Sequence, residues 1–309
     1  MALHVVVGKG PVGLTTARQL RDRGHEVRVV SRSGGASGDG IEHHRADAAD
    51  PAALASATRG AAAVYNAVNP AYHRWATDWP PVAAALLAAT ERAGAVLVTM
   101  SNLYGYGRPD GPMSPDSPLA AADTKGRVRA RMWADARAAH EAGRVRVTEA
   151  RAADFIGPQV PPGNSHLGRQ LATLRRGRTA WVVGDPDAPR SWAYLPDVAT
   201  TLVTLGTDER ALGQAWHVPS SRPRSQREAL GDLAAAMSAP APTVRGIPWP
   251  VLRAIGLAVP VMREVVAVRH QFDQEYVIDA AATTATFGIA PTPWTEVVAA
   301  TAGTAPVAG

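Results

Sequence analysis

Short apolar stretches alternate with longer alanine-rich stretches through the first half of the chain. The apolar stretches most typical of strands lie at residues 3–7, 26–30, 41–45, 62–67, 95–100 and 144–148. Because segments of helix length separate most of them, they predict parallel strands joined by helices. The pattern indicates an α/β fold with a Rossmann-type, doubly wound parallel sheet.

Helix boundaries are marked between these stretches. One helix is expected to begin at Pro11 and to end at Gly24. Asp50, which is followed by a proline, has the chemistry of an N-cap for the next helix. A third helix is expected over residues 81–93, where Gly94 ends it.

From about residue 158 the alternation gives way to loops that are rich in proline and glycine. Shorter helices are expected at 167–175, 198–205 and 227–237, and isolated strands at 180–183 and 215–218. We therefore expect a dinucleotide-binding Rossmann domain over residues 1–157, joined by parts of residues 190–220. Residues 158–309 are expected to form a smaller substrate-binding region packed on that domain.

Composition narrows the class of protein. The chain of 309 residues contains no cysteine, which excludes disulfides and thiolate chemistry. The net charge is +5, but the arginines are scattered among acidic residues, so we expect no nucleic-acid partner. Since no apolar run has the length of a signal segment or a membrane span, we expect a cytoplasmic protein that binds a small molecule and no membrane.

A glycine-rich turn follows the first expected strand and opens the first expected helix. Its residues are Gly8, Lys9, Gly10, Pro11, Val12 and Gly13. In this pattern the first glycine permits a tight turn, the second lets the backbone approach a pyrophosphate, and the third packs helix against strand. The turn predicts a dinucleotide site with the phosphates at the helix N-terminus.

The end of the second strand bears on the choice of cofactor. NAD-specific sites carry an acidic residue there, whereas this chain has Ser31 and Arg32. A guanidinium forms charge-assisted hydrogen bonds with a phosphate, so we expect NADP(H) in preference to NAD(H). Asp47, after the third strand, has two interpretations: a contact beside the adenine, or a cap for the segment that begins near Asp50.

Lysine is scarce in this chain. Of the 32 lysine and arginine residues, only Lys9 and Lys125 are lysines, and the others are arginines. Lysine is a compact donor whose charge can be tuned, and arginine does not replace it at a reactive site. Both lysines are therefore expected to be needed as lysines.

Several further segments occur in the order in which one known family carries its motifs. They are residues 64–69 (VYNAVN), 103–105 (LYG), 151–158 (RAADFIGP), 184–192 (GDPDAPRSW) and 194–199 (YLPDVA). With the glycine turn, they resemble the extended short-chain dehydrogenase/reductases, the NAD-dependent epimerase/dehydratase superfamily, over nearly the whole chain. The resemblance implies a homodimer and further cofactor contacts from Ala67, Val68, Asn69, Asp154 and Phe155.

The resemblance also assigns catalysis to a tyrosine four residues before a lysine, assisted by a serine or threonine. Lys125 matches the lysine, but Ala121 stands where the tyrosine is expected. The hydroxyl position falls on Met100, with Thr99 and Ser101 on either side. We therefore expect Lys125 to hold the nicotinamide ribose without activating a phenol.

If catalysis occurs, another proton donor must serve. The candidates are Tyr104, Tyr106, Ser101, Asn102 and Tyr72, and geometry decides among them. The substrate is expected to contact Tyr72, Trp75, His166, Arg190 and Trp192. So many aromatic residues favour an apolar or aromatic substrate.

Three functions of different class remain. The first, which we favour, is an NADP(H)-dependent reductase or dehydrogenase with a non-standard proton donor. The second is a redox-neutral epimerase, isomerase or cyclase that retains the cofactor, and the third is a noncatalytic NADP(H)-binding regulator. No metal is expected, because His43 and His44 are adjacent on a strand and point to opposite faces.

Overall fold

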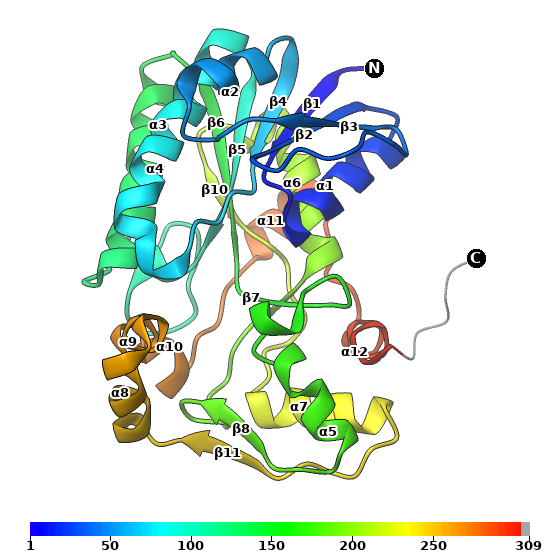
Figure 1. Ribbon diagram of the computed structural model, residues 1–309, viewed down its shortest axis with the longest axis vertical. Coiled ribbons are helices and arrows are strands. Elements are labelled where there is room, and N and C mark those ends of the chain that lie inside the picture. Colours follow the sequence, from blue (N-terminus) through cyan, green and yellow to red (C-terminus); the bar gives the residue numbers. More distant parts are fainter. Residues whose placement is uncertain (304–309) are drawn as a thin grey trace.

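The computed structural model describes residues 1–303 and contains a parallel sheet of seven strands (Figure 1). Its strands, in spatial order, are β3 (Ile41–Arg45), β2 (Glu26–Ser31), β1 (Leu3–Val7), β4 (Ala61–Asn66), β5 (Val96–Asn102), β6 (Arg146–Ala152) and β10 (Ala215–His217). Every neighbouring pair in this sheet is parallel. The predicted Rossmann-type fold class is confirmed.

Helices cover both faces of the sheet. One face carries α1 (Pro11–Asp22), α6 (Leu195–Thr207) and α11 (Ala281–Phe287), and the other carries α2 (Pro51–Ala57), α3 (Trp75–Ala93) and α4 (Thr124–Glu141). Alternation along β1 explains how one strand serves both layers. Val6 packs with the α1 and α6 side chains, whereas Val5 and Val7 pack with those of α2 and α3.

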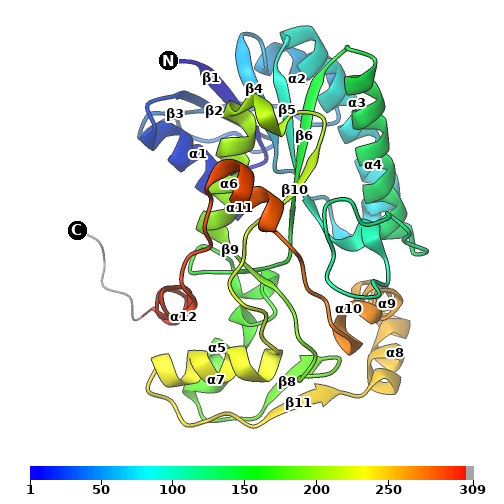
Figure 2. The same cartoon turned by 180° about the vertical axis from the view of Figure 1, so that it is seen from behind.

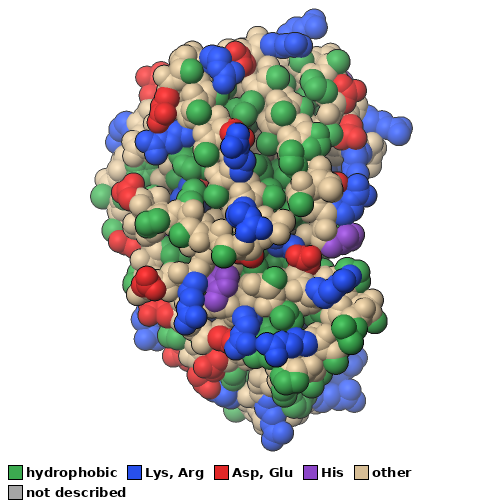
Figure 3. Space-filling view, turned by 90° about the vertical axis from the view of Figure 1, so that its left-hand side faces the viewer, with side chains coloured by type: hydrophobic (Ala, Val, Ile, Leu, Met, Phe, Trp, Pro, Cys, Tyr) green, Lys and Arg blue, Asp and Glu red, His purple; other side chains and the backbone are tan. Residues whose placement is uncertain are grey.

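A smaller lobe lies below the carboxyl ends of the sheet strands (Figure 2). It contains the strand pairs β7 (Asp154–Ile156) with β9 (Trp192–Tyr194) and β8 (Ala180–Val183) with β11 (Val244–Ile247). Its helices are α5 (Leu171–Arg175), α7 (Gln226–Ala236), α8 (Trp249–Ala258), α9 (Pro260–Ala267), α10 (His270–Asp273) and α12 (Trp294–Ala302). This lobe has an apolar core of its own, which includes Leu174, Leu230 and Trp294. The two lobes meet at a waist (Figure 3).

Short 3₁₀ helices complete the described chain. They are η1 (Tyr72–Arg74), η2 (Tyr104–Tyr106), η3 (Pro162–Asn164), η4 (Gly168–Gln170) and η5 (Glu209–Ala211). The first two follow β4 and β5 at the carboxyl edge of the sheet, which is where ligands of doubly wound folds bind. None of the helices within residues 1–303 is long and apolar enough to cross a membrane.

The predicted elements agree best where the pattern is local. Strands at 3–7, 41–45 and 180–183 match to the residue, and Asp50 caps α2 through the amides of Ala52 and Ala53. The helix expected from residue 81 was placed too late. It begins at Trp75, with Pro80 and Pro81 inside it. The helix expected at 167–175 is divided into η4 and the short α5.

Candidate cofactor and active site

The glycine-rich turn is packed as a dinucleotide site requires. Gly8 has φ of +119°, and a Cβ there would collide with the carbonyl of Ala67. A Cβ on Gly13 would collide with the carbonyl of Gly8, so these glycines bring β1, α1 and the loop after β4 together. Gly10 differs, because nothing lies within 4 Å of the place where its Cβ would be. The open side of Gly10 is the side from which a pyrophosphate can approach the backbone.

The N-terminus of α1 lies directly behind this opening. Gly10 is the N-cap and offers no side chain, and Pro11 occupies the first turn. The first intrahelical bond runs from the Leu14 amide to the Gly10 carbonyl at 2.9 Å. The amides of Val12 and Gly13 therefore have no acceptor within the helix. Amides in this arrangement bind phosphate oxygens, so the residues present fit a dinucleotide pyrophosphate.

Basic and hydroxyl side chains gather at the end of β2. Ser31 Oγ lies 3.5 Å from Ser33 Oγ, and Arg32 is exposed beside them. Lys9 extends from the glycine turn to the same loop, where Nζ donates to the Gly34 carbonyl at 3.0 Å. Sequence reasoning noted the scarcity of lysine but did not place Lys9 in this loop. Its place in the glycine turn next to the β2 end was the available signal.

Asp47 takes part in the turn before α2. Its Oδ1 accepts a hydrogen bond from the Ala49 amide at 3.0 Å, and its carbonyl accepts one from the Asp50 amide at 3.1 Å. The carboxylate is exposed. The structure thus gives Asp47 a turn-capping role, which is one of the two interpretations of the sequence.

The loop of Ala67, Val68 and Asn69 lies against the glycine turn. The Ala67 amide donates to the Val7 carbonyl at 2.8 Å, and the Val68 amide donates to Oδ1 of Asn66 at 3.2 Å. These bonds hold the loop next to Gly8 at the carboxyl ends of β1 and β4. The strand order reverses between these two strands, and this is the crevice in which such sheets bind ligands.

Lys125 projects from the first turn of α4 and is only 4% exposed. Oδ1 of Asp123 accepts from the Gly126 amide at 2.9 Å and so fixes the start of this helix. The ammonium lies 4.2 Å from the centre of the Tyr72 ring and forms an ion pair with Glu264 of α9. Lys125 therefore links both lobes. Sequence analysis missed Glu264 because it predicted no helix at α9.

Ala121 lies in the loop before α4, and its backbone packs against η2. Its amide donates to the Gly105 carbonyl at 3.2 Å. Gly107 has φ of +70°, and a Cβ there would come within 2.8 Å of the Ala121 Cα. At this position the chain offers only a methyl group and no hydroxyl.

Tyr72 and Tyr104 form a pair of phenols beside Lys125. The Tyr72 hydroxyl donates to Oη of Tyr104 at 3.2 Å. Burial raises the pKa of Tyr104 to about 12, while Arg190 and Asp154 act on it in opposite directions. Burial also raises the pKa of Tyr72, and the contact with Tyr104 raises it further. Both phenols are therefore neutral donors at ordinary pH.

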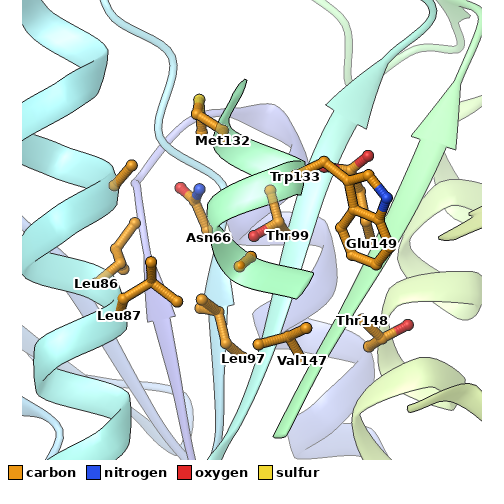
Figure 4. Close-up of a pocket in the computed structure, with 12 residues that line it drawn as sticks. Asn66, Leu86, Leu87, Leu97, Thr99, Met132, Trp133, Val147, Thr148 and Glu149 are labelled. Atoms are coloured by element: carbon orange, nitrogen blue, oxygen red, sulfur yellow. The ribbon is translucent and has the colours of Figure 1, made fainter. Parts of the chain in front are cut away.

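The other hydroxyl and amide candidates have different surroundings. Oδ1 of Asn102 accepts from the Tyr104 amide at 3.2 Å and stabilises the turn into η2. Ser101 is buried in β5, two residues after Thr99 and thus on the same face of the strand. Thr99 points, with Asn66 and Glu149, into a small pocket between the sheet, α3 and α4 (Figure 4).

Tyr106 lies outside the crevice. It is buried, its Oη accepts from Arg151 at 2.7 Å, and it lies 2.7 Å from Nε2 of His217. Arg151 in turn donates to Glu149 at 2.7 Å. The structure therefore places Tyr106 in an internal polar network and not near Tyr104 and Lys125.

A second charged group lies at the start of the smaller lobe. Asp154 forms an ion pair with Arg190, and Nε2 of His166 is 3.8 Å from Asp154 Oδ1. Although burial opposes ionisation of Asp154, Arg190 and His166 hold its pKa below the ordinary value. Burial lowers the pKa of His166 to about 4, so its ring is neutral near pH 7. The carbonyl of the neighbouring Phe155 accepts from Ser165 at 3.0 Å.

The two tryptophans expected at the substrate are buried. Nε1 of Trp75 donates to the Pro70 carbonyl at 3.1 Å, and Nε1 of Trp192 donates to the Arg224 carbonyl at 3.0 Å. The guanidinium of Arg190 lies 5.1 Å from the centre of the Trp192 ring. Both tryptophans thus support the walls of the site through packing, and their N–H groups are used within the chain.

The structure brings together Lys125, Tyr72, Tyr104, Asp154 and Arg190. It adds Tyr276, a residue that sequence analysis missed because no strand or helix was expected around it. The backbone of Tyr276 pairs with that of Arg190, and its pKa is raised well above the ordinary value by burial and by Tyr104. The arrangement offers several neutral phenols and a paired guanidinium beside a dinucleotide crevice.

Comparisons with known proteins agree with this architecture. Residues 5–218 match the model of the NAD dependent epimerase/dehydratase family. No curated protein matches the chain.

Solved structures share the fold at low sequence identity. The enzyme WbmH of Bordetella bronchiseptica, in complex with NAD+, is 19% identical with a TM-score of 0.74, and 98% of each chain is covered. The dTDP-glucose 4,6-dehydratase of Bacillus anthracis, in complex with NAD, is 14% identical with a TM-score of 0.81, over 98% of this chain and 96% of the other. The UDP-glucose 4-epimerase of Thermotoga maritima, with UDP-glucose, is 16% identical with a TM-score of 0.80 over 98% of both chains.

Proposed function

Because the chain belongs to the NAD-dependent epimerase/dehydratase family, we propose that it is an NADP(H)-dependent oxidoreductase. It interconverts a carbonyl and an alcohol on a small apolar or aromatic substrate. The observation that carries this proposal is the pair of neutral phenols, Tyr72 and Tyr104, next to the buried Lys125 and the dinucleotide crevice. This cluster supplies a hydroxyl where Ala121 supplies none.

Preference for NADP(H) is supported by the loop after β2. Lys9, Ser31, Arg32 and Ser33 present cations and hydroxyls there, and residues 31–38 contain no carboxylate. A 2′-phosphate is a dianion that such groups bind, whereas the 2′-hydroxyl of NAD is usually bound by an acidic side chain. Two of the solved structures described above contain NAD, and the proposal departs from them on this point.

Each residue of the site has a separate task in this proposal. The glycine turn and the α1 amides bind the pyrophosphate, and Lys125 holds the ribose next to the nicotinamide. When bound, the nicotinamide supplies or accepts a hydride at the substrate carbon. Tyr104 donates its hydroxyl proton to the substrate oxygen as the C=O π pair moves onto that oxygen. The hydrogen bond from Tyr72 then stabilises the phenolate oxygen of Tyr104.

The character of the walls supports an apolar or aromatic substrate. Tyr72, Tyr104, Phe272 and Tyr276 contribute rings near the paired charges of Asp154 and Arg190. The charge of Arg190 is already paired with Asp154 and is therefore not free for a diphosphate group. An aromatic or alicyclic ketone suits these walls better than a sugar nucleotide.

Two titrations and one assay test the proposal. Fluorescence titration should give NADPH binding that is at least tenfold tighter than NADH binding. NADPH consumption with a panel of aryl ketones, cyclic ketones and enones should identify a substrate. Tight NADH binding without NADPH binding would contradict the cofactor preference.

Two other outcomes of the assay would replace the proposed reaction. Substrate turnover without net change in NADPH absorbance would establish the redox-neutral alternative. Cofactor binding without any turnover would favour the regulator.

A further inference from the structure

Two buried hydrogen-bond donors next to Tyr104 have no acceptor. They are Nε of Arg190 and Oη of Tyr276, on side chains of residues that are 3% and 4% exposed. Neither atom has a hydrogen-bond partner anywhere in residues 1–303. Buried polar atoms in folded proteins are almost always hydrogen-bonded, so two orphan donors at one place indicate a missing acceptor.

The two donors lie on one face of a local strand pairing. Arg190 and Tyr276 form a parallel β-bridge, in which the Tyr276 amide donates to the Pro189 carbonyl at 2.9 Å. The Ser191 amide donates back to the Tyr276 carbonyl at 3.2 Å. Residues in register on adjacent strands project their side chains to the same face. The guanidinium and the phenol are therefore neighbours, and their backbones are fixed.

This face belongs to the candidate active site. Arg190 is held from one side by its ion pair with Asp154, and its guanidinium lies 5.1 Å from the ring centre of Phe272. Tyr276 is close enough to Tyr104 and Asp154 for both to raise its pKa. The orphan donors thus lie beside the phenol to which we assign proton donation.

Charge decides which acceptor fits. The carboxylate of Asp154 neutralises Arg190, so the two orphan donors offer hydrogen bonds without a free positive charge. A phosphate or carboxylate would meet the like charge of Asp154, whereas a carbonyl oxygen would not. A neutral carbonyl also accepts two hydrogen bonds at once through its two lone pairs.

We propose that Arg190 and Tyr276 form a subsite that binds the oxygen of a neutral carbonyl substrate. As an assignment of substrate class, this rests on the proposed function. In this subsite the two residues hold the oxygen through Nε and Oη, and they present it to Tyr104. Tyr276 thereby takes over, from the C-terminal lobe, the oxygen-polarising role of the hydroxyl that the family places at the end of β5.

The first test needs no substrate. The hydroxyl of Tyr276 is unpaired in the free protein, so Tyr276→Phe removes a desolvated polar group and should leave the melting temperature unchanged or raise it. Tyr65 provides the matched control, because its buried hydroxyl is bonded to Nδ1 of His4 at 3.0 Å. Tyr65→Phe should lower the melting temperature by about 1–3 °C. If Tyr276→Phe is as destabilised as the control, its hydroxyl has a structural partner and the subsite is refuted.

The second test uses two probes with the same ring. Acetophenone carries a neutral carbonyl and benzoate a carboxylate, and each is titrated against the protein saturated with NADP+. Acetophenone should bind the native protein more tightly, and Tyr276→Phe should weaken it roughly tenfold while the NADP+ affinity is unchanged. Arg190→Lys keeps the cation for Asp154 but has no Nε–H donor, and it should weaken acetophenone similarly.

The outcomes separate this subsite from the proposed reaction. Preferential binding of benzoate, or acetophenone binding that neither variant changes, would overturn the subsite even if NADPH reduces other ketones. Failure of NADP+ to bind would instead contradict the proposed function. The comparison of melting temperatures would still test the subsite in that case.

Discussion

Oη of Tyr106 lies 2.7 Å from Nε2 of His217, and this short contact fixes the direction of a buried hydrogen-bond chain. Nδ1 of His217 is 2.9 Å from the Asp279 carbonyl, which can only accept, so Nδ1 carries the proton. Nε2 is then the acceptor for the Tyr106 hydroxyl. Tyr106 in turn accepts from Arg151 at 2.7 Å, and each bond of the chain has a donor and an acceptor.

Buried neutral histidines such as His217 predict that the protein loses stability in mild acid. Burial lowers the pKa of His217 to about 4, and burial also lowers that of His4 to about 4. Between pH 6.5 and about 4 the unfolded chain binds these protons and the folded chain does not. As the pH is lowered through that window, the free energy of unfolding should therefore decrease, by up to about 3 kcal/mol for each histidine. Urea unfolding at pH 7.5, 6 and 5 measures the free energy of unfolding at each pH.

His217→Gln and His73→Gln serve as the comparison. The first should be less stable at pH 7.5 but should show a shallower decline towards pH 5, because one buried titration is gone. His73 is exposed, so its variant should follow the native curve. A native protein that is equally stable at pH 7.5 and pH 5 would contradict the assignment of neutral buried histidines.

Sequence predicted the parts of the site that depend on local spacing. The glycine turn specifies its own geometry, and Lys125 is located by the helix start that Asp123 caps. The end of β6 shows where local reasoning stops. The strand was expected to end at residue 148, but β6 continues through Glu149 and Arg151, which are buried and pair with each other at 2.7 Å.

Residues that arrive from the smaller lobe could not be predicted. Glu264 lies on α9, a short helix without a fully buried residue, in a segment for which no helix was predicted. Tyr276 lies outside any helix or strand, and only the pairing with Arg190 locates it. Trp75 was expected to contact the substrate, but it begins α3 and is buried there. Each of these placements depends on packing between distant segments.

Tyr104→Phe should remove most of the turnover without removing the cofactor. Loss of the proton donor is expected to lower kcat by about 10²-fold or more, while the Kd for NADPH stays within twofold. Stopped-flow absorbance and fluorescence titration measure the two quantities. The lost hydrogen bond with Tyr72 should have a small effect on stability.

Tyr106→Phe is the matched contrast, two residues along the chain. It removes one hydrogen bond of Arg151 and leaves Nε2 of His217 without a partner, so it should lower the free energy of unfolding by about 1–3 kcal/mol. Turnover per folded molecule should persist. If Tyr106→Phe abolishes turnover and Tyr104→Phe does not, the proton donor has been assigned to the wrong residue.

Lys125→Ala should weaken the binding of NADPH by about tenfold, because the ribose loses a charge-assisted donor. The variant also leaves Glu264 without its partner, and that effect must be separated. Glu264→Gln removes the ion pair but keeps Lys125, and it should bind NADPH at least as tightly as the native protein. Equal weakening in the two variants would mean that the ion pair, and not a ribose contact, sets the affinity.

Lys9→Ala and Arg32→Ala should each weaken NADPH binding and leave NADH binding unchanged. Lys9 already reaches the loop after β2, where it donates to the Gly34 carbonyl. The Arg32 side chain is exposed and can bind the 2′-phosphate of the cofactor. A charge-assisted hydrogen bond contributes about 1.5–3 kcal/mol, so each loss corresponds to a factor of about 10–150 in Kd at low salt. Arg59→Ala, a substitution at an exposed site after α2, controls for the loss of one positive charge.

Because the 2′-phosphate is the only difference between the two cofactors, a parallel loss of NADH affinity would place these side chains on the shared part of the dinucleotide. The preference for NADP(H) would then lack its structural basis.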